Sequence, residues 1–225
     1  MTHSISPPPR TSELVVDRMR SLIADGTWAV GGRIPAEPEL VAEFGVGRNT
    51  IREAVRALEH AGMLVPRRGD GTYVRSRSAL AGMIERCAPP TEARQLFEVR
   101  RALEGEAAAA AAERASADVV DGLRELLVAA ERAIEADDLD GYGRADIAFH
   151  AGLVAASDNP LLIELYGGIS EVIARGHPAV LALSLDRREH PRGHRDVVEA
   201  IAAHDPHRAR AAVQDYLDDA EQVAR

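Results

Sequence analysis

The segment from Ile34 to Val74 constrains the fold more than any other part of this sequence. A short apolar helix is followed by Gly45, a residue type that reaches positive φ at little cost in a sharp turn. Residues 48–60 then have the spacing of a helix that carries arginines on one side. After it, Met63–Arg67 and Thr72–Arg75 read as two strands around a basic tip. The segment therefore predicts a helix, a tight turn, a second helix and a β-hairpin, in that order.

The residues around this segment complete a small domain. Residues 13–24 repeat apolar side chains every three or four positions, which predicts an amphipathic helix. Arg33-Ile34 reads as a short edge strand, and Glu37–Phe44 is the first helix of the pair. We therefore predict that residues 12–78 form a winged helix-turn-helix, an α/β module that places one helix in the major groove of DNA.

The predicted recognition helix carries Arg48, Arg52 and Arg56 on one stripe, beside the apolar stripe that packs inward. The first two lie near the helix start and are expected to contact base edges, because recognition helices insert their first turns into the groove. Asn49 and Thr50 are expected to add hydrogen bonds to bases or phosphates, and Arg56 to reach a phosphate or remain in solvent. An ordinary α/β domain with solvated arginines is the alternative, but it does not account for the paired helices and the basic hairpin.

The charge of the chain is unevenly distributed. Over all 225 residues the net charge is −9, which at first argues against nucleic acid as a partner. Residues 1–78, however, hold 11 Arg and 9 acidic residues, whereas residues 79–225 hold 16 Arg and 27 acidic residues. The acidic surplus belongs to the second half and is compatible with DNA binding by the first.

Three further features bear on location. The lone Cys87 excludes an internal disulfide and fits a reducing compartment. The sequence has no run of about 18 apolar residues that would span a membrane. Residues 1–11 are polar and proline-rich, lack an apolar signal segment and are expected to form a disordered arm. We expect a soluble cytoplasmic protein with no membrane partner.

The second half of the chain is predicted to be all-α. Residues 79–91 read as a linker with a weakly helical stretch around Leu80–Arg86 and with Pro89-Pro90, after which only helical periodicity remains. Helix-start signals divide residues 92–225 into an antiparallel bundle of six helices. The predicted helices cover residues 91–114, 116–136, 140–156, 160–175 with a bend at Gly176–Pro178, 191–204 and 206–225.

Three side chains in this bundle have metal-ligand chemistry. Asp146 and His150 are four residues apart, so both lie on one helical face and can converge on one cation. His194, on the fifth helix, precedes an apolar stripe and is expected to face the same interior. This set predicts a metal site with an open position. The alternative is an Asp–His ion pair on a partly exposed helix face.

The first domain resembles a known family. The matching residues are Ile34-Pro35-Ala36-Glu37, Gly45-Val46, Arg48, Thr50, Arg52-Glu53-Ala54, Leu58, Gly62-Met63-Leu64 and Gly69–Val74. Through them, residues 12–75 resemble the DNA-binding domain of the GntR family of bacterial transcription regulators. The resemblance implies DNA contacts from Arg48, Asn49, Thr50 and Arg52 on the helix and from Arg68 and Gly69 in the wing.

Two residues depart from this family pattern. Pro38 stands where members often have an Arg that contacts DNA, so that contact is missing. Gly47 replaces the usual Ser or Thr that caps the recognition helix, which weakens the cap by roughly a few tenths of a kcal/mol. Neither departure changes the expected fold.

The second half resembles the FCD domain, the effector-binding domain of the FadR subfamily, over about residues 92–222. The resemblance rests on Asp146–His150, Ser157–Leu162, His194, Glu199–Ile201 and Asp205–Ala212. It implies a domain that binds an effector and dimerises. In metal-binding members, an Asp and three His hold a divalent ion under a small-molecule pocket. Three of these positions are matched by Asp146, His150 and His194.

Tyr216 stands at the fourth position, where a His is usual. A neutral phenol with a pKa of about 10 is a poor ligand, so three arrangements stay open. In the first, zinc or nickel, which suit imidazole and carboxylate, binds to three ligands and to water or effector. In the second, His190 supplies the missing ligand. In the third, no ion binds and Tyr216 donates a hydrogen bond to the effector.

Arg100 matches an Arg of the first FCD helix that tends to point into the cavity. Its guanidinium suits a carboxylate effector, an organic acid, because the two groups form forked hydrogen bonds. The alternative is an exposed Arg that pairs with Glu104 four residues later.

These features predict a ligand-responsive transcription regulator, a repressor that binds a palindromic operator in double-stranded DNA as a homodimer. One winged domain contacts one half-site, so two-fold symmetry follows from the geometry of DNA. The effector would have to bind more tightly to the arrangement that does not bind DNA. Two alternatives are a regulator whose signal is the ion itself and a metal-dependent enzyme. Against the enzyme, no carboxylate general base is evident beside the Asp/His set.

Overall fold

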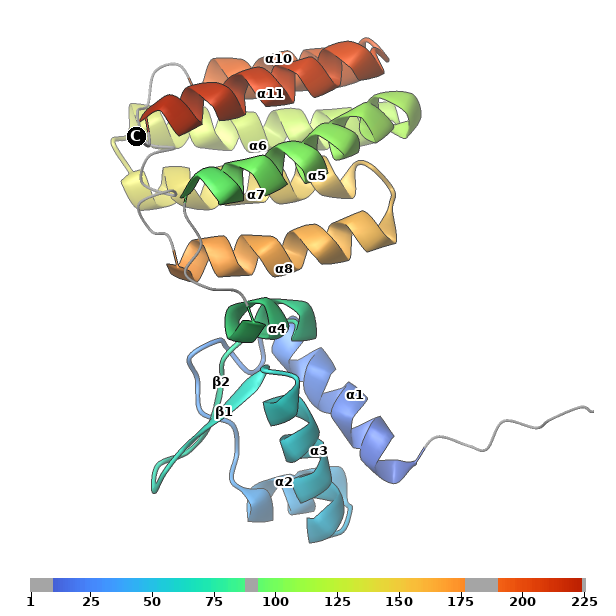
Figure 1. Ribbon diagram of the computed structural model, residues 1–225, viewed down its shortest axis with the longest axis vertical. Helices are drawn as coiled ribbons and strands as arrows, with labels where there is room; N and C mark the ends of the chain where they lie inside the picture. Colours follow the sequence, from blue (N-terminus) through green and yellow to red (C-terminus); the bar gives the residue numbers. More distant parts are fainter. Residues whose placement is uncertain (1–9, 88–92, 177–189, 224–225) are drawn as a thin grey trace, which may run out of the picture. The chain divides into compact units, whose positions relative to one another are not determined.

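The computed structural model describes residues 10–87, 93–176 and 190–223 (Figure 1). The chain divides into two compact units, Met1–Cys87 and Ala88–Arg225. Most of the predicted disordered arm, the second part of the predicted linker and the side chain of Cys87 lie outside the described residues.

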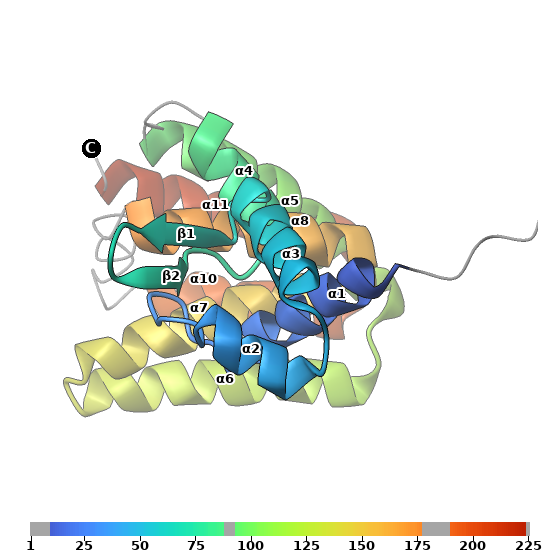
Figure 2. The same ribbon diagram turned by 90° about the horizontal axis from the view of Figure 1, so that it is seen from below.

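The first unit is the predicted winged helix-turn-helix (Figure 2). The strands pair antiparallel, from Leu64 with Val74 to Arg67 with Gly71. The predicted edge strand appears as a single bridge between Arg33 and Tyr73. The elements of the unit, in order, are α1 (Thr11–Ala24), α2 (Glu37–Phe44), α3 (Arg48–His60), β1 (Leu64–Arg67), β2 (Gly71–Val74) and α4 (Ala79–Cys87).

Helix α3 is anchored to the core of this unit by one side only. Ile51, Ala54 and Leu58 are buried, whereas Val55, which the spacing also places inward, is half-buried. Gly45 ends α2 with a φ of 64°, the left-handed conformation that the predicted sharp turn requires. The fold therefore fixes the axis of α3 and leaves its opposite side exposed.

The first helix begins slightly earlier than predicted. The periodicity places its start at residue 13, but α1 begins at Thr11. The Glu13 carboxylate accepts a hydrogen bond from the backbone N–H of Arg10 at 2.9 Å, which satisfies a donor at the helix start. This hydrogen bond extends the helix to residues before the apolar repeat, which the periodicity could not include.

Part of the predicted linker is helical. Residues 79–87 form α4, which approaches the turn after α3 through two glycines. A Cβ added to Gly82 would meet the backbone carbon of Gly62 at 2.7 Å, so a larger residue would separate the two segments. This close approach holds α4 against the first unit, which extends to Cys87.

The second unit is an all-α bundle, as the helical periodicity predicts (Figure 1). None of the described helices combines the length and apolarity needed to cross a membrane. The predicted bend at Gly176–Pro178 falls at residues outside the described ranges. The described helices are α5 (Ala93–Arg114), α6 (Ala117–Glu135), α7 (Leu139–Ala155), α8 (Pro160–Gly176), α10 (His190–Ala202) and α11 (Pro206–Val223).

Helix α5 lies at the centre of this bundle, with α7, α8, α10 and α11 as neighbours. Alanine methyl groups fill much of its buried surface, so the neighbouring backbones pack closely against it. Arg100 and Glu104 lie just before this alanine run, and the burial of α5 carries both side chains into the bundle. The alanines with fully buried side chains are Ala107, Ala108, Ala111 and Ala112.

Candidate functional site

Helix α3 presents a row of exposed arginines, as its spacing predicts. The side chains of Arg48 and Arg52 are 63% and 51% exposed, and Arg56 is exposed beside them. Asn49 is exposed and Thr50 is half-buried. All five residues are therefore accessible on the helix, and their DNA contacts remain predictions.

Glu37, the first residue of α2, joins the two leading arginines. Its Oε2 accepts hydrogen bonds from Arg48 Nε at 3.3 Å and from Arg52 Nε at 3.1 Å, and its Oε1 lies 3.1 Å from the same Arg52 nitrogen. Burial raises the pKa of Glu37, but Arg52 and Arg48 outweigh this and lower it, so the carboxylate stays ionised. The sequence motif contains Glu37, but only the fold brings it between the two arginines.

The hairpin tip carries Arg68 and Gly69, the two predicted wing contacts, and both are exposed. Gly69 has a φ of 78°, which favours glycine at this turn. Tyr73 donates a hydrogen bond to Asp70 Oδ2 at 2.7 Å, which raises the pKa of the phenol. The guanidinium of Arg67 lies 3.9 Å from the centre of the Tyr73 ring. These contacts brace the hairpin next to its tip.

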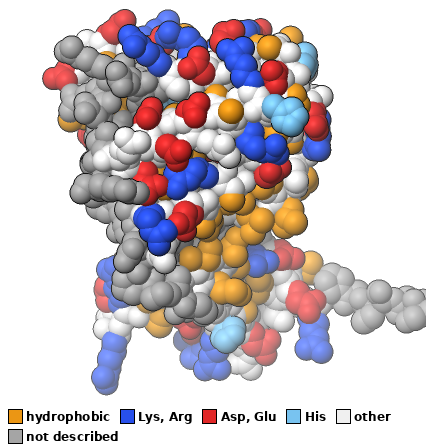
Figure 3. Space-filling model, turned by 45° about the horizontal axis from the view of Figure 1, so that its top comes forward, with side chains coloured by type: hydrophobic (Ala, Val, Ile, Leu, Met, Phe, Trp, Pro, Cys, Tyr) orange, Lys and Arg blue, Asp and Glu red, His pale blue; other side chains and the backbone are white. Residues whose placement is uncertain are grey.

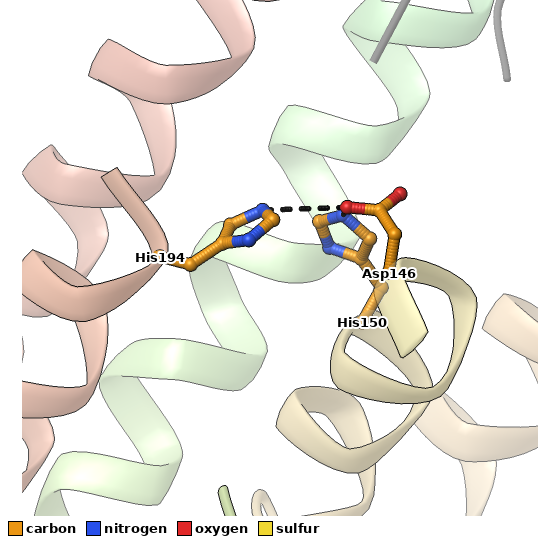
Figure 4. A group of neighbouring side chains, drawn as sticks. All are labelled: Asp146, His150 and His194. Atoms are coloured by element: carbon orange, nitrogen blue, oxygen red, sulfur yellow. Dashed lines mark ion pairs between the residues drawn. The ribbon is translucent and has the colours of Figure 1, made fainter. Parts of the chain in front are cut away.

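The three predicted metal ligands converge inside the helical bundle (Figure 4). Asp146 and His150 come from α7, and His194 comes from α10. Asp146 Oδ1 lies 3.5 Å from His150 Nε2 and 3.9 Å from His194 Nε2. All three residues are buried, and one ligand atom of each lies within 4.8 Å of the others. The alternative, a partly exposed Asp–His pair, is correct in the pairing and wrong in the exposure.

Glu104 is a fully buried carboxylate beside this set, and no pattern in the sequence indicates its burial. Its Oε1 accepts hydrogen bonds from Arg100 Nε at 2.7 Å and from the Tyr166 hydroxyl at 3.1 Å. Its Oε2 accepts one from the Tyr216 hydroxyl and lies 3.0 Å from His150 Nδ1. Burial raises the pKa of Glu104, but Arg100 and His150 hold it well below its usual range. A carboxylate that the sequence analysis did not anticipate therefore lies beside the Asp/His set, tied to an arginine and two tyrosines.

Arg100 links this carboxylate to the predicted ligands. The residue is 6% exposed, and its Nη2 lies 3.0 Å from His150 Nε2. A guanidinium has no acceptor, so Nε2 accepts this bond only when the ring is neutral, with its proton on Nδ1, facing Glu104. Burial lowers the pKa of His150, and Glu104 raises it, to about 9 in balance. Protonation of Nε2 therefore competes with the Arg100 contact.

The two expectations for Arg100 are each half correct. The pairing with Glu104 is present, but the pair is buried and not exposed. The guanidinium lies in the interior beside His150, as the resemblance implies. Its role in effector binding remains a prediction.

The hydroxyl of Tyr216 donates a hydrogen bond to Glu104. Its hydroxyl lies 3.5 Å from His150 Nδ1, whereas Asp146 approaches the opposite ring nitrogen, Nε2. Burial raises the pKa of Tyr216 well above its ordinary value, so the phenol stays neutral. Gly193 makes room for this side chain, because a Cβ there would lie 2.5 Å from Tyr216 Cβ. Tyr216 supports the buried carboxylate and does not replace the missing His as a ligand in this arrangement.

The donor set fits a divalent transition-metal ion. One carboxylate and two imidazoles are ligands that zinc and nickel accept, and three protein ligands leave positions for water or an effector. Their ligand atoms are close enough to one another to share one ion. The side chain of His190, the other candidate ligand, lies outside the described residues.

The two units together define a class of protein. A winged helix-turn-helix with an exposed arginine helix reads DNA, and an all-α unit with a buried polar site offers a place for a ligand. That combination is a ligand-responsive transcription regulator. Residues 11–74 match the gntR family of bacterial regulatory proteins, and residues 95–219 match the FCD domain. The chain belongs to the GntR family, whose members are DNA-binding regulators and not enzymes.

Individual relatives agree with this assignment. The chain is 31% identical to the putative L-lactate dehydrogenase operon regulatory protein of Escherichia coli K12 over 228 residues, covering 93% of this chain and 84% of the relative. It is 27% identical to the transcriptional repressor NanR of the same strain, covering 93% and 82% of the two chains. A solved GntR structure from Streptococcus agalactiae matches with a TM-score of 0.57 and 29% identity, covering 94% of this chain and 99% of that chain.

Proposed function

We propose that this regulator represses transcription by binding a palindromic operator as a homodimer, and that an organic acid in the buried site releases it. The observation that carries the proposal is the buried cluster, in which three ligand atoms lie together beside the Arg100 guanidinium. Repression is supported by the 27% identity to a relative that is named a repressor. Because bacterial DNA is in the cytoplasm, the proposal places the protein there.

The DNA contacts in this proposal follow the exposed side of α3 and the wing. A bidentate Arg–guanine pair gives about 1–3 kcal/mol of discrimination against other bases. Contacts to phosphates fix the register of the protein and carry no sequence information. The residues assigned to base edges are Arg48, Asn49, Thr50 and Arg52, and those assigned to the DNA backbone are Arg56, Arg68 and Gly69.

Helix α8 offers a surface for the second copy. Leu161 and Leu165, four residues apart on one face of the helix, are 69% and 37% exposed. Figure 3 shows that hydrophobic side chains gather on one part of the helical unit's surface. Exposed apolar patches of this kind mark association sites. The second copy is the occupant we propose, because one winged domain reads only one half-site of a palindrome.

The charges of the buried cluster favour an ion together with a carboxylate. A metal ion binds carboxylates and neutral imidazoles, and in that ligand state Asp146 and Glu104 outnumber the guanidinium of Arg100 by one charge. A divalent ion held by Asp146, His150 and His194 reverses this sign, and one carboxylate then neutralises the site. Such an ion would supply a Lewis-acid anchor for the acid. Arg100 would add a forked hydrogen-bond donor.

Fluorescence anisotropy tests this proposal with duplexes that the protein selects from a random library. L-Lactate is the first acid to add, because one relative is named for an L-lactate dehydrogenase operon. We expect zinc and L-lactate together, or another small organic acid, to weaken binding of the selected duplex about tenfold or more. His194→Asn should remove the response and keep DNA binding. DNA binding that ignores zinc and every acid tested would contradict the proposal.

A second candidate is that the ion alone is the signal. The observation that favours it is the bond from Arg100 to His150 Nε2, because an ion needs the same lone pair. An ion and Arg100 therefore exclude one another at this nitrogen. Titrating zinc or nickel without any acid distinguishes the two candidates, because only an ion sensor changes its DNA affinity in that experiment.

A further inference from the structure

Glu37 is an acidic residue on the side of the first unit that we assign to DNA. Its side chain is 36% exposed. It lines a groove of about 500 Å³ beside α3 and β2, together with Arg52 and Arg56. A carboxylate in this position repels phosphates and lowers the general affinity for DNA. Its presence there requires a compensating role.

The hydrogen bonds of Glu37 show what that role is. Both Arg48 and Arg52 donate to it through Nε, at 3.3 Å and 3.1 Å. A guanidinium pairs with the O6 and N7 atoms of guanine through two parallel N–H groups. The bonds to Glu37 use the side edge of each guanidinium, and the terminal edge, Nη1 and Nη2, has the geometry for a base. One carboxylate thus orders two long side chains without using the groups that read guanine.

We infer that Glu37 is a positioning residue that sets the sequence specificity of this regulator. It acts in two ways. It holds Arg48 and Arg52 in place before DNA arrives, which reduces the entropy lost when they meet their bases. It also repels phosphates, which weakens complexes in which the arginines find no base. The inference rests on the base contacts proposed for the two arginines.

Three single variants of the full-length protein separate these effects. Glu37→Gln removes the charge and keeps the shape of the side chain. Glu37→Asp keeps the charge but is one methylene too short to reach both arginines. Glu43→Gln is the matched control, because Glu43 is exposed on the same helix and, in the described part of the chain, pairs with neither arginine.

The measurement is the ratio of dissociation constants for a scrambled duplex and for a duplex selected by the parent protein from a random library. For Glu37→Gln we expect the scrambled duplex to bind more tightly and the ratio to fall about tenfold. For Glu37→Asp we expect the ratio to fall without tighter binding of the scrambled duplex. Glu43→Gln should shift both constants alike and keep the ratio. Circular dichroism of each variant verifies that α2 is folded.

Two results would overturn the inference. One is a ratio for Glu37→Gln within twofold of the parent. The other is an equal fall of the ratio for Glu43→Gln, because the effect would then come from charge alone. Arg48→Gln and Arg52→Gln distinguish this failure from failure of the underlying contacts. If both arginine variants keep the parental ratio, the proposed base readout is wrong; if only Glu37→Gln keeps it, the readout stands and the positioning role is wrong.

Discussion

Two arginine–glutamate clusters in this chain have the same chemistry and opposite surroundings. On the first unit, Arg48 and Arg52 share Glu37 at the surface. In the second unit, Arg100 pairs with Glu104 in the interior, where the carboxylate has no contact with solvent. In both clusters an arginine Nε donates to a glutamate carboxylate, at 3.1–3.3 Å on the surface and at 2.7 Å in the interior. The main difference between the two clusters is therefore their burial.

This difference sets how each cluster can be used. An exposed ion pair contributes about 0–1 kcal/mol to stability, so Glu37 can orient the two arginines without being part of the framework of its unit. Removing one partner of a buried pair costs about 3–5 kcal/mol, because a charge is left without compensation in a medium of low polarity. The surface cluster is suited to orient exposed side chains, and the buried one is suited to hold a fixed framework around the proposed ligand site.

The largest expected effect comes from Glu104→Gln. This change leaves the Arg100 guanidinium uncompensated in the interior, and we expect the free energy of unfolding to fall by about 3–5 kcal/mol. Urea denaturation followed by circular dichroism measures it. Glu106→Gln is the control, because Glu106 forms an exposed pair with Arg210 at 2.8 Å on the same helix. If the two variants lose the same free energy of unfolding, the buried pair and the surface pair contribute equally to stability and the proposed difference is wrong.

The next effect concerns DNA and not stability. Arg48→Ala removes a proposed guanine contact, so discrimination between selected and scrambled duplexes should fall by about 1–3 kcal/mol. The helical unit should unfold at the parental urea concentration, because Arg48 belongs to the other unit. A variant that retains the parental preference for the selected duplex would exclude Arg48 from base readout.

A smaller effect is expected for zinc binding to Arg100→Lys. Lysine keeps the charge next to Glu104, but its single nitrogen cannot also hold His150 Nε2 as the guanidinium does. The freed lone pair should make zinc bind about tenfold more tightly, or about 1.4 kcal/mol, by calorimetry. Arg101→Lys is the neighbouring control, since Arg101 pairs with Asp218 and Glu221 instead. Unchanged zinc affinity in Arg100→Lys would mean that the guanidinium does not compete with the ion.

The smallest effect is the change in stability of Glu37→Gln. Because its ion pairs are exposed, the free energy of unfolding should change by about 0.5 kcal/mol or less. Thermal unfolding of Glu37→Gln and Glu104→Gln under the same conditions compares the two losses of stability directly. A loss as large as that of the buried variant would show that Glu37 is part of the framework of its unit, and the contrast between the clusters would disappear.

Much of the fold is predictable because its signals are local. The spacing of apolar residues gives the bounds of α2 and α3, and Gly45 marks the turn between them. In the helical unit, the four-residue spacing of Asp146 and His150 places both ligands on one face of α7. In these cases the interacting residues lie within one helix or one turn, so their order in the sequence is enough to predict the structure.

The buried network around Glu104 is not predictable in this way. Tyr166 and Tyr216 are 62 and 112 positions away along the chain, so only the packing of the bundle brings their hydroxyls to the carboxylate. An Arg and a Glu four residues apart also look the same on an exposed helix and on a buried one. The alanine run makes α5 a central helix, and a run of alanines alone does not say how many neighbours surround it.

The alanines of α5 also have a mechanical consequence. An alanine side chain has no heavy-atom rotamer, so Ala107, Ala108, Ala111 and Ala112 cannot adapt to a moved neighbour by changing rotamer. Under the proposed function, displacement of Arg100 by a ligand would therefore have to be accommodated by the backbone of α5 where it packs on α11.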